Sequence, residues 1–163
     1  MICFPTQRDK AFFLKLFLLP LSFCFQAVVK CRNLLYERRI FKVHKCDVPV
    51  VSVGNIVAGG SGKTPFVLFL AQQLIPFGKV AIVSRGYLGR AEKQRKPLVV
   101  ARGQGTLEPL ITPSICGDEP FLLSKNLPGA IVVVGRNRVE AARMAVREGA
   151  QIVILDDGMQ HRR

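Results

Sequence analysis

Residues 48–67 read VPVVSVGNIVAGGSGKTPFV, and this stretch decides the predicted fold. It opens with a short β-branched run, continues through glycines to Gly-Lys-Thr at 62–64, and passes into an apolar stretch, 66–75, that suits a helix. A strand, a glycine-rich loop and a helix with proline near its first turn form the context that a phosphate-binding loop requires. The sequence therefore predicts a P-loop at the start of an α/β domain.

The residue types of this loop suit phosphate binding. Glycines let successive backbone N–H groups point at phosphate oxygens, and the following helix directs its positive dipole end at the same anion. Lys63 can reach the β- and γ-phosphates, and Thr64 can hold Mg²⁺. The strict motif places its first glycine where this chain has Val57, so neighbouring glycines must supply the flexibility. The alternative is a glycine-rich turn with an incidental Gly-Lys-Thr.

Downstream, apolar runs alternate with polar and helical segments. Continuous apolar strands separated by helices are typical of a parallel sheet covered on both faces. We therefore predict a P-loop NTPase-like α/β fold with helices on both faces of a parallel sheet. Strands are predicted at 48–53, 79–84, 97–101, 130–134 and 151–155, helices at 66–75 and 137–148, and a basic, glycine-punctuated loop at 85–97.

The last predicted strand ends in two carboxylates, Asp156 and Asp157. Carboxylates at the carboxyl end of a central parallel strand can lie beside a P-loop and hold Mg²⁺, directly or through water. A strand followed by an ordinary Asp-Asp-Gly turn is the alternative. The P-loop upstream favours a metal-associated pair.

The N-terminal part differs from the rest in charge and apolarity. Residues 1–46 carry nine Lys and Arg against two acids, whereas residues 47–163 carry fifteen against nine. The run 11–29, AFFLKLFLLPLSFCFQAVV, contains only one charge, Lys15, and has Pro20 near its centre. An interfacial helix tolerates both residues more easily than a spanning one, and a signal sequence or a buried core helix is the third alternative. We predict a basic, apolar, membrane-associated segment, 1–46, followed by a P-loop core, 47–163.

Composition narrows the classes of protein. With 163 residues, 49% of them hydrophobic, the chain is too apolar to be disordered throughout. Its five cysteines are odd in number and scattered, which disfavours a disulfide scaffold or structural zinc site and favours a reducing compartment. The net charge of +13 indicates an anionic membrane surface first and nucleic acid second, with simple solubility as the alternative.

Four segments together resemble one family. VPVVSVGNIVAGGSGKTPFV (48–67), SRGYLGR (84–90), GDEPFLL (117–123) and ILDDGMQHRR (154–163) stand in the order found in the tetraacyldisaccharide 4'-kinases, the lipid A kinases. The resemblance implies ATP-dependent phosphorylation of the 4'-hydroxyl of tetraacyldisaccharide 1-phosphate, the lipid A precursor. It also implies a peripheral or N-terminally anchored enzyme on the cytoplasmic face of the inner membrane of a Gram-negative bacterium, with no nucleic acid partner expected.

The resemblance also implies roles for individual residues. Lys63 would stabilise the transferring phosphate, and Asp118 would be the catalytic base that draws the proton from the sugar hydroxyl; from sequence alone, Asp118 suits a helix N-cap equally well. Mg²⁺ would be held by Thr64, Asp156 and Asp157. The residues implied to bind ATP are Val57, Ala58, Gly59, Gly60, Ser61, Gly62, Lys63, Thr64, Gln160 and His161, the last of which would otherwise lie in a solvated loop. Candidates for phosphate contact or simple surface charge are Arg85, Arg90, Arg136 and Arg138.

Two departures from the family pattern bear on function. Met159 stands where the family usually has Phe, and members of the family run to about twice this length. We therefore expect this sequence to correspond to the N-terminal half of such a kinase. The alternatives are an inactive nucleotide-binding fragment and a different P-loop ATPase.

Overall fold

The chain forms two compact units, Met1–Val43 and His44–Arg163. The computed structural model describes residues 7–38, 40–41, 43–55, 62–104 and 111–158. The division of the chain into a membrane-associated segment and a kinase core stays a prediction about function.

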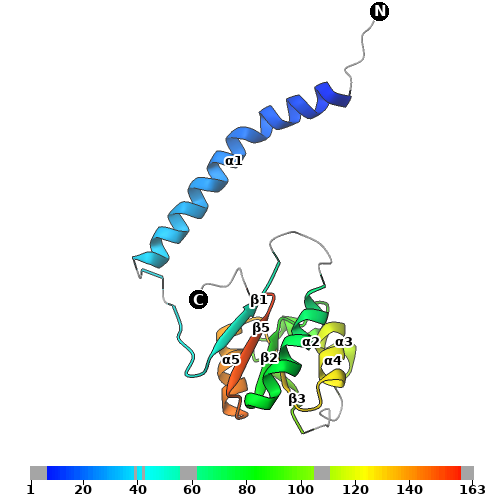
Figure 1. Ribbon diagram of the computed structural model, residues 1–163. Helices are drawn as coiled ribbons and strands as arrows, with labels where there is room; N and C mark the ends of the chain where they lie inside the picture. The colour runs from blue at the N-terminus through cyan, green and yellow to red at the C-terminus, as the bar shows by residue number, and fades with distance from the viewer. Residues whose placement is uncertain (1–6, 39, 42, 56–61, 105–110, 159–163) are drawn as a thin grey trace, which may run out of the picture. The chain divides into compact units, whose positions relative to one another are not determined.

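The first unit contains one long helix, α1, Gln7–Glu37 (Figure 1). Its 31 residues correspond to a length of about 46 Å, and Pro20 lies inside it. Within the described part of the chain, its stretch Leu18–Glu37 is long and apolar enough to cross a membrane, with no share of that window buried. The core helix of a soluble protein and a signal sequence can meet the same criteria of length and composition. The predicted N-terminal apolar helix is confirmed, and it extends beyond the apolar run in both directions.

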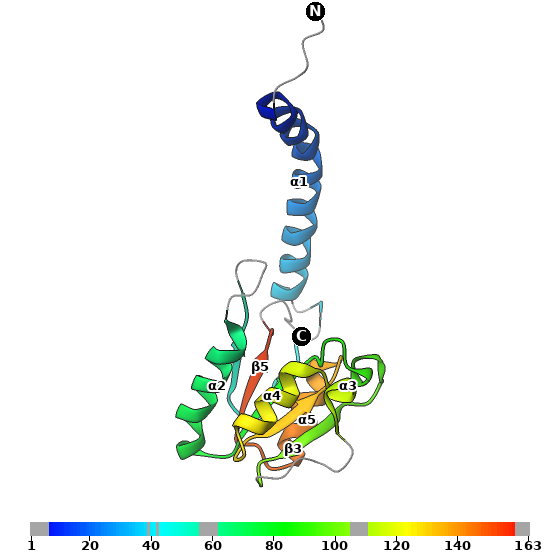
Figure 2. The ribbon, with the colours of Figure 1, turned by 90° about the vertical axis from the view of Figure 1, so that its right-hand side faces the viewer.

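The second unit is built on a five-stranded sheet in the order β1-β5-β2-β4-β3 (Figures 1 and 2). Four of the strands are parallel. Each begins one or two residues after its predicted start, because the first residues of each apolar run belong to the connection that precedes the strand. The P-loop strand β1 pairs directly with β5, which carries the two carboxylates. The bounds are β1 Val50–Val53, β2 Val80–Ser84, β3 Leu98–Arg102, β4 Ile131–Val134 and β5 Ile152–Asp156.

The predicted parallel sheet is confirmed for these four strands, whereas the fifth strand, β3, runs antiparallel to β4. A parallel connection needs a crossover of a dozen or more residues, usually a helix, to return the chain to the opposite edge. The segment between β2 and β3 contains only a short 3₁₀ helix, η2, Arg90–Lys93. The chain therefore turns back along the sheet instead of crossing over it.

Helices cover both faces of the sheet, as predicted. On one face lie α2, Lys63–Leu74, and α4, Asp118–Asn126; on the other lies α5, Arg138–Arg147 (Figure 2). Two shorter elements, η1, Ile75–Phe77, and α3, Pro113–Cys116, lead into β2 and α4 respectively. This layering places the N-termini of α2, α4 and α5 at the carboxyl ends of the parallel strands.

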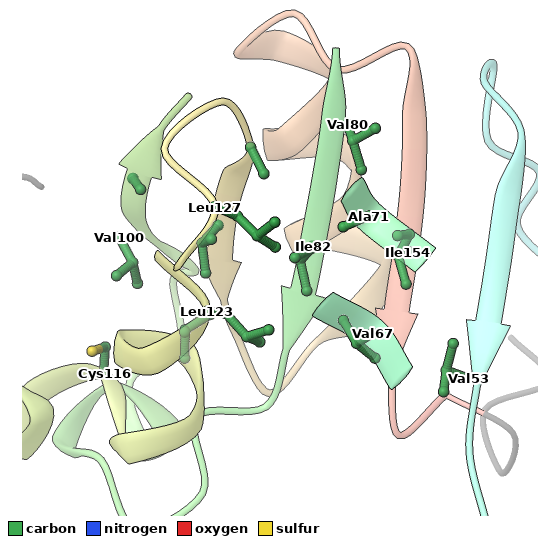
Figure 3. Close-up of a cluster of buried hydrophobic side chains, with 14 of the residues drawn as sticks. Val53, Val67, Ala71, Val80, Ile82, Val100, Cys116, Leu123, Leu127 and Ile154 are labelled. Atoms are coloured by element: carbon green, nitrogen blue, oxygen red, sulfur yellow. The ribbon is translucent and has the colours of Figure 1, made fainter. Parts of the chain in front are cut away.

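The core follows from alternation along the central strands. In β2, Val80 and Ile82 face the α2–α4 layer, whereas Ala81 and Val83 face α5. Val67 and Ala71 of α2 pack in the same cluster as Val80 and Ile82 (Figure 3). Each fully buried Val, Ile or Leu contributes about 1.5–3 kcal/mol, so the two-layer core is what fixes the polar residues at the strand ends.

Candidate active site at the carboxyl edge of the sheet

The carboxyl ends of the parallel strands bring together residues that are far apart in the sequence. Lys63 at the start of α2 lies beside Asp157, 94 residues later, and Ser84 at the end of β2 lies beside Asp156, 72 residues later. The first turn of α4 belongs to the same charged group, since the charges of Lys63 and Asp156 both act on Glu119. In open α/β sheets ligands bind outside this edge.

The described end of the phosphate-binding loop has the backbone geometry that its sequence predicts. Gly62 has φ 70°, the left-handed region that favours glycine, and it precedes α2 without a side chain capping the helix. Among the described residues no side chain caps the first amide groups of α2, which therefore suit an external anion. Outside the described residues lie other members of the predicted nucleotide site, Val57, Ala58, Gly59, Gly60, Ser61, Gln160 and His161, together with Met159.

Lys63 makes a direct ion pair at this edge. Its Nζ lies 2.8 Å from Oδ1 of Asp157, and this hydrogen bond is the largest of the effects that raise the pKa of the lysine. Asp157 itself has φ 56°, a conformation that aspartate tolerates better than most residues. The pair is half-exposed, so we assign it little stability and regard it as a positioned charge.

Asp156 is buried, with 3% of its surface exposed. The hydroxyl of Ser84 donates to its Oδ2 at 3.2 Å, and Nη2 of Arg138 donates to its backbone oxygen at 2.9 Å. Burial raises the pKa of Asp156, and the Ser84 hydrogen bond and the Arg138 charge only partly offset that effect. The carboxylate is therefore held in place by its neighbours without being fully compensated in charge.

Asp118 is the first residue of α4, and the capping position belongs to Gly117, whose φ of 91° suits only glycine. Asp118 therefore does not cap the helix. Its carboxylate is exposed in the first turn of α4. The next residue, Glu119, was not singled out from the sequence. Burial and the nearby charge of Asp156 raise its pKa, so Glu119 is a further candidate for this site.

The four candidate arginines differ in environment. Arg138 is buried, with 6% exposed, and burial lowers its pKa. Its Nε and Nη1 have no hydrogen-bond partner among the residues that the structure describes. Arg85 pairs with Glu92 at 3.0 Å, and Arg90 and Arg136 are exposed. The alternative of a surface charge is thus wrong for Arg138, whose buried guanidinium donates to the backbone oxygen of Asp156.

The residues predicted to hold Mg²⁺ fit that ion in part. Thr64, Asp156 and Asp157 offer oxygen donors, the type that Mg²⁺ prefers, and the incompletely compensated charge of buried Asp156 would be stabilised by a cation. No cluster of three or more His, Cys, Asp or Glu suited to a metal is present in the described ranges. A nucleotide-bound Mg²⁺ needs only one or two carboxylates, because phosphates and waters complete its shell.

The sequence profile of the tetraacyldisaccharide-1-P 4'-kinase family matches residues 14–163. The chain belongs to this family. A tetraacyldisaccharide 4'-kinase from Syntrophotalea carbinolica is 46% identical over 147 residues, which cover 89% of this chain and 40% of the relative. Another from Desulfotalea psychrophila is 41% identical over 144 residues, covering 87% of this chain and 40% of the relative. Both relatives thus extend well beyond the matched region.

A solved structure agrees with the family assignment. The crystal structure of LpxK from Aquifex aeolicus in complex with ATP superposes with a TM-score of 0.75 at 40% identity, covering 91% of this chain and 45% of that one. This chain spans about two-fifths of the length of the curated relatives that it matches. The prediction that it corresponds to part of such a kinase, with an α/β P-loop fold, is confirmed.

Proposed function

We propose that this chain carries the nucleotide-binding and catalytic part of an ATP-dependent kinase that phosphorylates the 4'-hydroxyl of tetraacyldisaccharide 1-phosphate. One observation carries the proposal: a chain of this family brings Lys63, Asp156 and Asp157 together in front of the uncapped N-terminus of α2. That arrangement matches what phosphoryl transfer needs, namely fixed positive charge and oriented amides at the transferring group. The name of the Aquifex aeolicus structure, a complex with ATP, supports ATP as the nucleotide.

The proposed mechanism assigns a task to each side chain. Lys63, kept protonated by its raised pKa, exchanges Asp157 for the β- and γ-phosphate oxygens when nucleotide binds. Asp118, which lies in the first turn of α4, accepts the proton of the sugar hydroxyl. Asp156 and Asp157, with Thr64, would hold Mg²⁺, which would supply charge neutralisation on the phosphates. Residues 57–61, Gln160 and His161 complete the nucleotide site in this proposal.

The membrane location is part of the same proposal. The substrate class is a lipid, and the exposed apolar side chains of α1 suit a helix that lies in or crosses a bilayer. The cations of residues 1–46 suit an anionic surface, which is consistent with the cytoplasmic face of a Gram-negative inner membrane. We assign no nucleic acid partner.

The test measures ATP binding and phosphoryl transfer separately on the 163-residue chain in mixed micelles. Lys63→Ala should weaken ATP binding and abolish transfer to tetraacyldisaccharide 1-phosphate, whereas Asp118→Asn should abolish transfer and leave ATP binding intact. Lys125→Ala, at an exposed lysine in the last turn of α4, is the matched control and should change neither. ATP binding or turnover that is indifferent to Lys63→Ala would refute the site.

The second candidate function is a nucleotide-binding fragment without transferase activity. The matched region covers 40% of the length of the two curated relatives named above. ATP binding that depends on Lys63, together with no detectable transfer by the unaltered chain, would select this function over the kinase.

A further inference from the structure

The loop that follows β2 exposes two apolar residues at its tip. Tyr87 is 67% exposed and Leu88 80% exposed, although both lie within the compact second unit. They are the central residues of a tight turn closed by a hydrogen bond from the Gly89 amide to the Gly86 oxygen at 2.9 Å. Leaving a leucine in water at this position gives the fold no packing benefit.

The backbone conformation of Leu88 makes its presence more unusual. Its φ is 64°, the left-handed conformation that glycine or asparagine normally supplies at the third position of such a turn. For other L-residues this conformation is strained. The position thus carries a residue that suits neither the local backbone nor the surrounding solvent, so neither folding nor solubility explains a leucine here.

The base of the turn is locked against the site. A Cβ on Gly86 would lie 2.7 Å from the backbone oxygen of Cys116, and one on Gly89 would lie 2.6 Å from the amide nitrogen of Gly117. The amide of Leu88 also donates to Glu92 at 3.3 Å. The turn is therefore held directly against the residues that precede Asp118.

The surroundings of the tip are strongly basic. Between residues 85 and 96 there are five Lys and Arg and a single acid, Glu92, which is engaged internally with Arg85 at 3.0 Å. All five cations are exposed: Arg85, Arg90, Lys93, Arg95 and Lys96. Exposed apolar side chains surrounded by cations match the composition of a bilayer interface rich in anionic lipid, where apolar groups insert and cations meet phosphates.

We propose that the Tyr87–Leu88 tip is a membrane-insertion site on the catalytic unit, and that its occupant is the interfacial region of an anionic bilayer. Through this contact the second unit docks its carboxyl edge on the membrane by itself, in addition to any contact made by α1. The inference goes beyond the proposed kinase function and depends on none of its chemical steps. Ser84, which precedes the loop, bonds Asp156, so the docked tip brings the bilayer surface to the phosphate site.

The chain has no tryptophan, so a single introduced one reports on its own position. Leu88→Trp places the probe at the tip. Phe77→Trp is the matched control, because Phe77 is 81% exposed and lies before the start of β2, at the opposite edge of the sheet. Both full-length variants are mixed with phosphatidylglycerol vesicles, with phosphatidylcholine vesicles and with the soluble polyanion heparin.

With phosphatidylglycerol, the emission of Trp at position 88 should move to shorter wavelength and become protected from iodide, while that at position 77 should not change. Three results would overturn the proposal: no change at either position although the protein sediments with the vesicles, equal changes at both, or a change at position 88 with heparin alone. Leu88→Gly relieves the backbone strain and so keeps the fold; it should weaken phosphatidylglycerol binding by about tenfold. Unchanged binding of that folded variant would also overturn it.

Discussion

Replacing Asp156 with asparagine should make the protein more stable at neutral pH. The side chain is 3% exposed, and burial raises its pKa above the ordinary value despite the Ser84 hydrogen bond and the Arg138 charge. A raised carboxylate pKa means that the folded state holds the proton more tightly than the unfolded one. Stability is therefore lost as pH rises from the ordinary pKa through the raised one, and the loss persists at neutral pH.

Each pH unit by which a pKa is displaced corresponds to about 1.4 kcal/mol. Asparagine keeps the shape and an acceptor for the Ser84 hydroxyl while removing the charge, so we expect Asp156→Asn to add about 1–2 kcal/mol to the free energy of unfolding at pH 7. Urea unfolding in a non-ionic detergent, followed by circular dichroism, measures this difference. Well below the ordinary aspartate pKa the side chain is protonated in both states, so the part of the difference that comes from its charge should vanish.

The control is Asp157→Asn, at the neighbouring carboxylate that is 64% exposed on its side chain. It loses the ion pair with Lys63 and should lower stability slightly, by less than about 1 kcal/mol. The reasoning fails if Asp156→Asn destabilises the protein at pH 7, or if its gain is the same at pH 3.5 as at pH 7. Either result would mean that the buried charge is fully compensated.

Two further substitutions test the support around the site. Ser84→Ala removes the hydroxyl that donates to Asp156 and should lower the free energy of unfolding at pH 7 by about 1 kcal/mol, an effect that urea titration should find diminished in the Asp156→Asn background. Gly117→Ala places a Cβ 2.8 Å from the backbone oxygen of Tyr87 at a φ of 91°, so it should lower stability by about 2 kcal/mol or more. A melting temperature equal to that of the unaltered chain would exclude this close contact.

Much of the fold could be predicted because each apolar run specifies its own element. The strands are found within two residues of their predicted starts, and the P-loop helix begins at Lys63, three residues before its predicted start. The direction of β3 could not be predicted in this way. It depends on the 85–97 connection, which contains only the short 3₁₀ helix η2 and no crossover helix.

Residues of the candidate site could be predicted where they belong to a sequence motif. They could not be predicted where only the order of the strands brings them to the site. Lys63, Asp118, Asp156 and Asp157 stand in recognisable patterns. Ser84 closes an apolar strand without any motif, and it joins the site only because β2 lies beside β5. Glu119 could have been found, because it directly follows Asp118 and is the second acidic residue of the first turn of α4.

The two buried charges at this edge, Arg138 and Asp156, compensate each other only in part. Arg138 donates to the backbone oxygen of Asp156, not to its carboxylate, so the guanidinium fixes the end of β5 while leaving the negative charge only partly offset. A direct side-chain pair would have compensated both charges more fully. The carboxylate is left able to attract a cation from solution, which is the property that a site for metal-bound phosphate requires. The predicted loss of folding stability from ionised Asp156 at neutral pH and the proposed binding of Mg²⁺ therefore have the same physical origin, a buried and only partly compensated negative charge.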